Sequence, residues 1–198
     1  MSVPKANSPA IDKSGKNSNV NQNNPNVYFL AGEMEGKAKR KVDIPAGKAI
    51  LLLLIGHEFS PAEVIGLLSR SSLVNYINTS PGIAPKLTSQ QLSKLKDLAR
   101  EHVDYMYSLD AVIDEGTDKE LRLHTGQLCQ FRIASTFSVD FVSNNVFDTL
   151  DGITPVAADG YYLFIRENTF KKDEDHTLWF SAVAPGYSTE VSFSIHIS

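Results

Sequence analysis

The sequence predicts a mainly β fold: a single β-sandwich, jelly-roll-like, with an inserted pair of α-helices. The first observation is an alternation of apolar and polar side chains in the C-terminal runs 161–165, 177–183 and 191–197. A period of two is typical of strands, because successive side chains leave a pleated backbone on opposite faces. A sheet with one wet face must bury its other face against a second layer, which favours a sandwich. The second observation is two helix-start signals in the middle of the chain.

Length and composition set limits on the function. The chain has 198 residues, a formal net charge of -4 and one cysteine. This length suits one domain with a tail, and the acidic balance disfavours nucleic acid as a partner. A single cysteine excludes an intrachain disulfide, and we expect Cys129, inside a strand-like run, to be a small buried hydrophobe. The longest apolar run, 49–55, is too short to span a bilayer.

Residues 1–26 are rich in Asn, Ser and Lys and contain hardly any large apolar side chain. Such a segment cannot offset its ordering entropy by burial, so we expect a disordered leader followed by a sandwich domain at 27–198. No signal-peptide core stands at the N-terminus. Two locations therefore stay open: the cytosol, or the outside of the cell for a chain whose targeting segment was removed.

Three strands are expected after the leader, at 27–32, 37–44 and 49–55. In the second strand Lys37, Lys39 and Lys41 line one face. This row indicates either an anion-binding patch or an edge strand protected from pairing, and we favour the edge strand. The third strand is apolar on both faces, as in a central strand covered on both sides, and Gly56 is expected to end it.

The helical insertion is expected at about 60–107. Its two capping boxes are Ser60 with Glu63 and Thr88 with Gln91. The second box opens the longest helical pattern, over 89–107, where apolar residues recur at spacings of three and four. His102 is expected at the rim of this apolar stripe, not as a metal ligand.

Strands are expected to resume at 109–113, 121–123, 127–133 and 137–142. A loop follows, and the final strands begin after Asp159-Gly160. In the last strand the alternation predicts a core face and a wet face. The core face holds Val191, Phe193, Ile195 and Ile197, and the wet face holds Ser192, Ser194 and His196.

Short motifs along residues 27–197 resemble those of a family of bacterial exported proteins of uncharacterised function. The motifs are Phe29-Leu30-Ala31-Gly32, Ile44-Pro45-Ala46-Gly47-Lys48, Asp114-Glu115-Gly116, Asp159-Gly160-Tyr161-Tyr162 and His176-Thr177. Two departures are Tyr162 in place of a tryptophan, and a charged loop at 168–175 in place of a Pro/Gly-rich one. The resemblance implies a β-sandwich fold and an extracellular or periplasmic location, and it implies no activity.

His57 and Glu58 form the one His-carboxylate pair at an expected strand end. An acid/base pair or two metal ligands are conceivable there, with a third group from another loop. Adjacent residues of a strand point apart, however. We therefore expect His57 and Glu58 to precede the next helix or to be exposed polar side chains, and not to form a site. No cofactor is predicted.

Two further groups of residues are weaker candidates. Asp114, Asp118 and Glu120 place oxygen ligands around a glycine, as a hard cation requires, but Lys119 opposes the charge and a solvated turn is favoured. Tyr162 and Trp179 would stack on a sugar if they lie on a wet sheet face, and would otherwise pack beneath the helices.

Three functional hypotheses follow. The leading one is a non-catalytic exported domain that binds a ligand or acts as a surface scaffold, with a carbohydrate or another surface protein as partner. The second is a metal-assisted or carboxylate-based hydrolase with His57 and Glu58 in its site. The third is a structural protein that assembles through its sheet edges.

Overall fold

The computed structural model describes residues 3–34, 36–61, 85–148 and 151–198. The chain divides into two compact units. The first comprises Met1–Ser8, Gly56–Asp104 and Ile133–Gly160, and the second comprises Pro9–Ile55, Tyr105–Arg132 and Tyr161–Ser198. The domain boundary expected at residue 27 is a boundary of neither unit. Each unit is therefore described separately.

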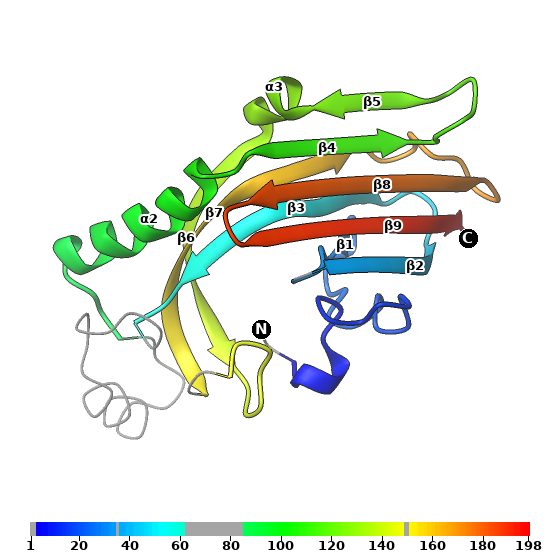
Figure 1. Cartoon of the computed structure of the whole chain (residues 1–198). Helices are drawn as coiled ribbons and strands as arrows, with labels where there is room; N and C mark the ends of the chain where they lie inside the picture. The colour runs from blue at the N-terminus through cyan, green and yellow to red at the C-terminus, as the bar shows by residue number, and fades with distance from the viewer. Residues whose placement is uncertain (1–2, 35, 62–84, 149–150) are drawn as a thin grey trace. The chain divides into compact units, whose positions relative to one another are not determined.

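The described strands form two sheets, which confirms the prediction of a mainly β fold (Figure 1). The four-stranded sheet has the order β1-β3-β7-β6, and the five-stranded sheet has the order β2-β9-β8-β4-β5. The bounds are β1 Val27–Leu30, β2 Gly36–Ile44, β3 Ala49–Phe59, β4 Ser108–Ile113, β5 Leu121–His124, β6 Arg132–Phe141, β7 Gly152–Ile165, β8 Asp175–Ala184 and β9 Tyr187–Ile197. By these bounds β3, β6 and β7 contain residues of both units.

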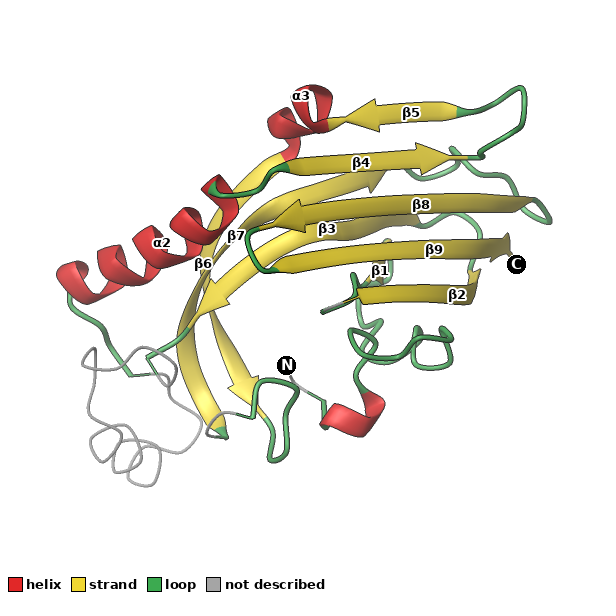
Figure 2. Ribbon diagram, viewed as in Figure 1, coloured by secondary structure: helices red, strands yellow, loops and turns green. Residues whose placement is uncertain are grey.

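The five-stranded sheet belongs to the second unit, and its strands run side by side in Figure 2. β9 pairs in parallel with β2 and antiparallel with β8, so Phe193 has Arg40 and Leu178 as its neighbours. The alternation predicted for β9 is confirmed. Its core face is at most 3% exposed and consists of Val191, Phe193, Ile195 and Ile197.

The first unit contains the long helix α2, Ser89–Asp104 (Figure 2). It begins where the sequence predicts and ends three residues earlier than expected. The capping box is present: Gln91 N–H donates to Thr88 Oγ1 (3.2 Å), and Thr88 N–H donates to Gln91 Oε1 (2.9 Å). Leu95 packs against Ala157 of β7, so the helix covers this part of the sheet within the first unit. The helix predicted after Ser60 falls on 62–84, outside the described residues.

The strand predicted at 127–133 is wrong over 127–131, where the chain is helical, and only Arg132 and Ile133 belong to a strand, β6. Residues Thr125–Leu128 form the short helix α3, and Cys129–Phe131 form a 3-10 turn. Thr125 fixes the start: its Oγ1 accepts the Leu109 N–H (2.8 Å) and donates to the Leu109 carbonyl (3.1 Å). Cys129 consequently lies on the surface and is not the buried hydrophobe that a strand would have made it.

Two other strand predictions are corrected. β3 continues past Gly56 to Phe59, and its Leu51 and Leu53 are only half-buried, so one face of this strand is not fully covered. β7 begins at Gly152 and not after Gly160. Alternation misses its first half because Pro155 and the Ala157-Ala158 pair interrupt the period of two.

The N-terminal segment makes contacts that the expectation of a disordered leader does not anticipate. Ser14 O accepts the Lys41 N–H (3.0 Å), so the segment bonds the free edge of β2. Gly15, at a φ of +90°, lies against the same residue: a Cβ there would stand 2.3 Å from the Lys41 carbonyl oxygen. Asp12 accepts the N–H groups of Ser14 and Asn17 (2.9 and 2.7 Å). Polar side chains and a glycine, more than apolar burial, fix this segment.

None of the described helices has the length and apolar character needed to traverse a lipid bilayer.

Candidate functional site

The outward face of the five-stranded sheet carries a row of side chains that crosses all five strands. Paired residues of neighbouring strands point to the same face, so the pairing register of the five strands defines the row. From β2 to β5 it consists of Lys39, Ser192, Trp179, Val112 and Arg122. The next row contains Lys41, Ser194 and Thr177. Short hydroxyl side chains thus separate the lysines of β2 from Trp179, and we call these two rows the tryptophan face.

Trp179 is half-buried at the middle of this face. Its side chain donates a hydrogen bond to Glu190, which also pairs with Lys37 (2.6 Å). The Lys37 ammonium, followed by the Trp179 hydrogen bond, holds the pKa of Glu190 below its ordinary value.

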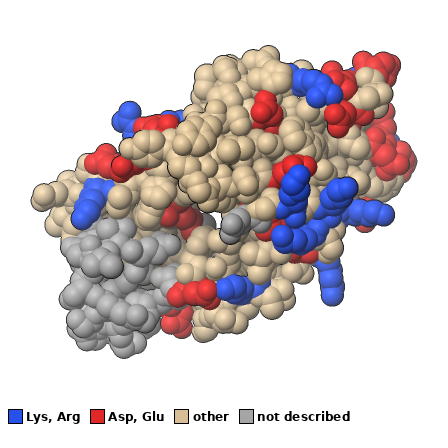
Figure 3. Space-filling view, viewed as in Figure 1, with Lys and Arg blue, Asp and Glu red and all other residues tan. Residues whose placement is uncertain are grey.

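Positive charge lies to one side of Trp179. Lys and Arg side chains gather over β2 and β9 in Figure 3, whereas Asp and Glu gather at the far end of the sheet, over the loops between β4 and β5 and before β8. Among the described residues Lys37 pairs with Glu190, and no ion pair involves Lys39 or Lys41. Strands lie about 4.8 Å apart, so the backbones of Lys39 and Trp179 are about 10 Å apart across Ser192.

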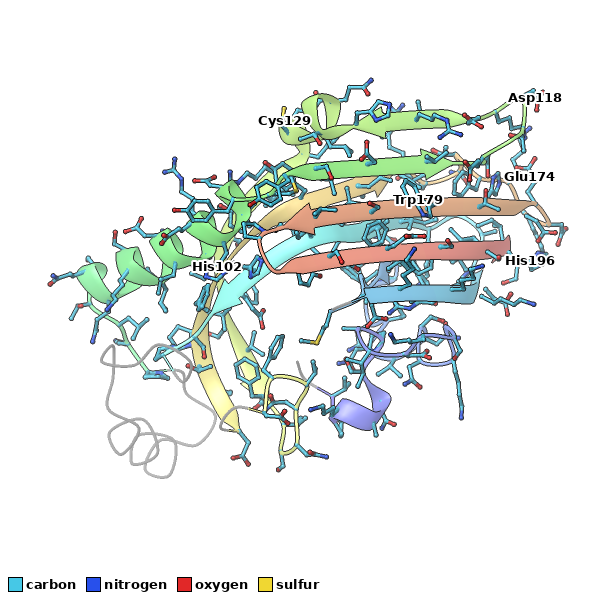
Figure 4. All side chains as sticks on the ribbon, viewed as in Figure 1. His102, Asp118, Cys129, Glu174, Trp179 and His196 are labelled. Carbon is cyan, nitrogen blue, oxygen red and sulfur yellow. The ribbon has the colours of Figure 1, made fainter. Side chains whose placement is uncertain are left out.

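Figure 4 shows Trp179 on β8, away from Asp118 and Glu174 in the loops at the strand ends. Tyr162, the other aromatic candidate, lies on β7 of the other sheet and is half-buried. The two aromatic residues therefore belong to different sheets. Trp179 lies between Ser192 of β9 and the buried Val112 of β4.

In the first unit, the structure brings a third polar residue, His102, next to the His57 and Glu58 pair. The ring of His102, on α2, lies 4.7 Å from the ring of His57, centroid to centroid, and 5.2 Å from that of Phe59. Burial, and then the neighbouring His102, hold the pKa of His57 below its ordinary value. The sequence places His102 on the apolar stripe of its helix, but only the fold brings it to β3. Within the described residues, no three His, Cys, Asp or Glu side chains gather as a metal centre requires.

The candidate cation ligands Asp114, Asp118 and Glu120 do not converge. Asp114, in a left-handed backbone conformation with a φ of +52°, accepts from His176 Nδ1 (2.8 Å) and from the Thr177 N–H (3.0 Å). Glu120 accepts the Gly116 N–H (2.7 Å) and pairs with Arg122. Asp118 is exposed in the same loop (Figure 4). The Glu120 carboxylate thus stabilises the turn itself, and the Asp114 carboxylate bonds the start of the turn to β8.

His176 and Arg40 are buried polar residues that were not predicted as site residues; His176 was noted in the sequence only as part of the His176-Thr177 turn motif. His176 contacts Asp114 and Glu174 through its two ring nitrogens and stacks on Phe170, with 3.7 Å between ring centroids. Arg40 donates to Glu33 (3.0 Å) and to backbone carbonyls that include those of Asp12 (2.6 Å) and Ala31. In sequence, Arg40 is visible only as a cation on the apolar side of a strand. Both residues are enclosed by protein partners, which indicates structural roles.

Comparison of the chain with protein-family models, with curated proteins and with solved structures finds no match. The function must therefore be inferred from the arrangement of side chains.

Proposed function

We propose that this protein is a non-catalytic binding domain whose tryptophan face takes an extended acidic glycan. The observation that carries the proposal is Trp179, half-buried beside Glu190, with the hydroxyls of Ser192, Ser194 and Thr177 on the same face and Lys39 and Lys41 on the adjacent edge. An aromatic ring offers an apolar platform for a sugar ring, and hydroxyl side chains exchange hydrogen bonds with sugar hydroxyls.

The acidic character of the ligand follows from the two lysines. Lys39 lies one strand beyond Ser192, so a sugar that follows the one stacked on Trp179 brings its carboxylate or sulfate within reach of the ammonium group. Such contacts are exposed and weaken with salt. The resemblance to exported bacterial proteins supports a place outside the cytoplasm, where a domain would meet such polymers.

We also infer that the two sheets form a sandwich. Support comes from the second unit, where each sheet buries one face: Phe180 and Phe193 in one, Ile50 and Leu52 in the other, all at most 2% exposed. A jelly-roll topology is not part of this inference, because β1-β3 and β2-β9 pair in parallel, whereas jelly rolls are antiparallel.

Trp179 is the single tryptophan of the chain, so intrinsic fluorescence reports directly on the proposed site. We expect polygalacturonate to change the emission in a saturable and salt-sensitive way. Calorimetry on the Lys39→Ala/Lys41→Ala double variant should show at least a tenfold weaker affinity. The matched control is Lys171→Ala/Lys172→Ala, which removes the same charge from a loop outside the face and should bind as wild type does.

Three results would change the proposal. If a neutral glucan binds equally well, the ligand is not restricted to acidic glycans, but the tryptophan face still binds a glycan. Tighter binding of a single-stranded oligonucleotide would assign the same face to nucleic acid. No response to any polymer, with Trp179→Phe indistinguishable from wild type in calorimetry, would eliminate the site. The metal-assisted form of the hydrolase hypothesis ranks lower because a catalytic zinc site needs three ligands, and no such group of three gathers among the described residues.

A further inference from the structure

β6 is the last strand of the four-stranded sheet, and none of the described strands pairs with its outer edge. Residues 133–138 are all exposed, including the large apolar side chains of Ile133 (53%) and Phe137 (41%). Proteins usually protect an edge strand with lysine, proline, an inward-pointing charge or a covering loop. The six residues Ile-Ala-Ser-Thr-Phe-Ser contain neither a charge nor a proline.

The other edges of the described sheets are protected. The outer backbone groups of β1 are bonded by Gln22, whose side chain both donates to and accepts from Phe29. The outer edge of β2 is bonded by Ser14, through its carbonyl and the Lys41 N–H. β5 has only four residues, and two of them are Arg122 and His124. Among the described strands, β6 alone combines length, apolar side chains and an unprotected edge.

The sequence of β6 is complementary to itself when two copies run antiparallel. In the register centred on Ser135, that residue faces its own copy, and Ile133 faces Phe137 twice, once on each side of the two-fold axis. All three lie on one face, because side chains alternate along a strand. Cross-strand pairs of aromatic and β-branched residues are among the stabilising ones. Shifting the centre by one residue, to Thr136, places Phe137 opposite Ser135 instead.

Charge is also compatible with self-pairing. A strand that pairs with its own copy meets its own charges, and the paired segment carries none. At the ends of the paired segment the charges are of opposite sign, because Asp140 of one copy comes diagonally opposite Arg132 of the other. Within each copy the Arg132 guanidinium lies over the Tyr161 ring, 5.8 Å from its centroid. We therefore propose that two copies of this chain associate through β6, in an isologous antiparallel pair that joins their four-stranded sheets.

The area that is available sets the strength of this dimer. A standard stable interface involves about 20–30 residues a side. The paired segment offers six, with the flanking charges in addition. We expect a dissociable dimer whose fraction rises with protein concentration, as sedimentation velocity and light scattering measure. Phe137→Lys replaces the aromatic partner of Ile133 by an ammonium group at both ends of the paired segment. It should keep the protein monomeric at every concentration, with an unchanged melting temperature because Phe137 is exposed.

Cysteine crosslinking tests the register. In a Cys129→Ser background, Ser135→Cys places two thiols directly opposite, at the Cα separation of about 4.5–5.5 Å that a disulfide accepts. Thr136→Cys is the matched control, because its copy lies diagonally, at about 7–8 Å. We expect mild oxidation to give a disulfide-linked dimer for Ser135→Cys and little for Thr136→Cys.

Equal crosslinking of the two variants would overturn the register. A wild-type protein that stays monomeric at the highest concentration, or a dimer that Phe137→Lys leaves intact, would overturn the proposal itself. If Phe137→Lys melts early, Ile133→Lys, at the more exposed partner position, makes the same test.

Discussion

The side-chain amide of Gln22 forms two hydrogen bonds with the backbone of Phe29: its Nε2 donates to the carbonyl oxygen (2.7 Å), and its Oε1 accepts the N–H (2.9 Å). An amide placed in this way imitates the backbone of a neighbouring strand. It occupies the outer edge of β1, which otherwise offers free donors and acceptors to other chains. Together with Ser14 on β2, it gives the Asn-rich segment a role in closing sheet edges.

Replacement of Gln22 should therefore destabilise the protein. Gln22→Ala removes these two bonds and the one that Nε2 donates to the Ser18 carbonyl (2.8 Å). It should cost about 1 kcal/mol or more of unfolding free energy, since each neutral bond at a partly exposed site contributes modestly. Chemical denaturation measures the change. Asn23→Ala, at an exposed neighbour, is the control and should be nearly neutral. If both variants unfold at the wild-type midpoint, the segment is a tether that contributes nothing to the edge.

The buried ion pair between Arg40 and Glu33 gives a larger effect. Both side chains are 3% exposed, and burial, opposed mainly by Glu33, lowers the pKa of Arg40 from its ordinary value. Arg40→Met leaves the Glu33 carboxylate buried without its cation and also removes the donor to the Asp12 carbonyl. We expect a loss of about 3–5 kcal/mol.

Lys41→Met is the control for this experiment, because it deletes a cation from the exposed face of the same strand. Its unfolding free energy should stay close to that of wild type. A similar loss in both variants would mean that β2 is turned over relative to the structure, since a shift of one residue exchanges the two faces.

Two histidine-carboxylate pairs have similar geometry and differ in burial, so comparing them shows how much burial adds to the contribution of the contact to stability. His176 lies 2.8 Å from Asp114 with a side chain 5% exposed, and His196 lies 2.8 Å from Asp175 with a side chain 46% exposed. His176→Ala leaves Asp114 buried without its partner and should cost about 3 kcal/mol. His196→Ala should change stability little, because water replaces an exposed partner. Thermal melts at matched pH make the comparison, and equal shifts would contradict it.

The regular strands could be predicted from sequence because local patterning determines them. In β9 every second residue is apolar, so burial of one face fixes the alternation of Phe193 and Ser192 without knowledge of the partner strands. The helix α2 was predictable for the same reason, with Thr88 marking its start. Such features depend on residues adjacent in sequence.

The remaining features depend on partners distant in sequence. Thr125 begins a helix because its hydroxyl meets Leu109, and Gln22 is ordered because Phe29 lies at a free edge. The candidate site divides in the same way. Trp179 was identified from the strand pattern, but its neighbours Ser192 and Lys39 come from strands whose order and parallel pairing no local signal specifies.

The pH dependence of stability should have an acidic limb to which His57 contributes. Burial, and then His102 at 4.7 Å, hold the pKa of His57 below its ordinary value of 6.5. Between the folded and the unfolded pKa, the unfolded chain binds a proton that the folded chain does not, so stability rises with pH in that window. The contribution is therefore complete above about pH 6.5 and is lost as the pH falls below it.

The His57→Gln variant cannot take up this proton and should lose less stability than wild type between pH 7 and about 5, as urea midpoints at each pH measure. His196→Gln is the contrasting variant. Asp175 raises the pKa of His196, so its contribution is present in acid and is lost as the pH rises through the folded value. Removing His196 should therefore steepen the loss in acid, whereas removing His57 should flatten it. Two results would contradict this prediction: curves of urea midpoint against pH that are parallel for wild type and His57→Gln, or a His57 proton resonance that titrates at or above pH 6.5. Either would show that the His57 ring is hydrated and does not contact His102 on α2.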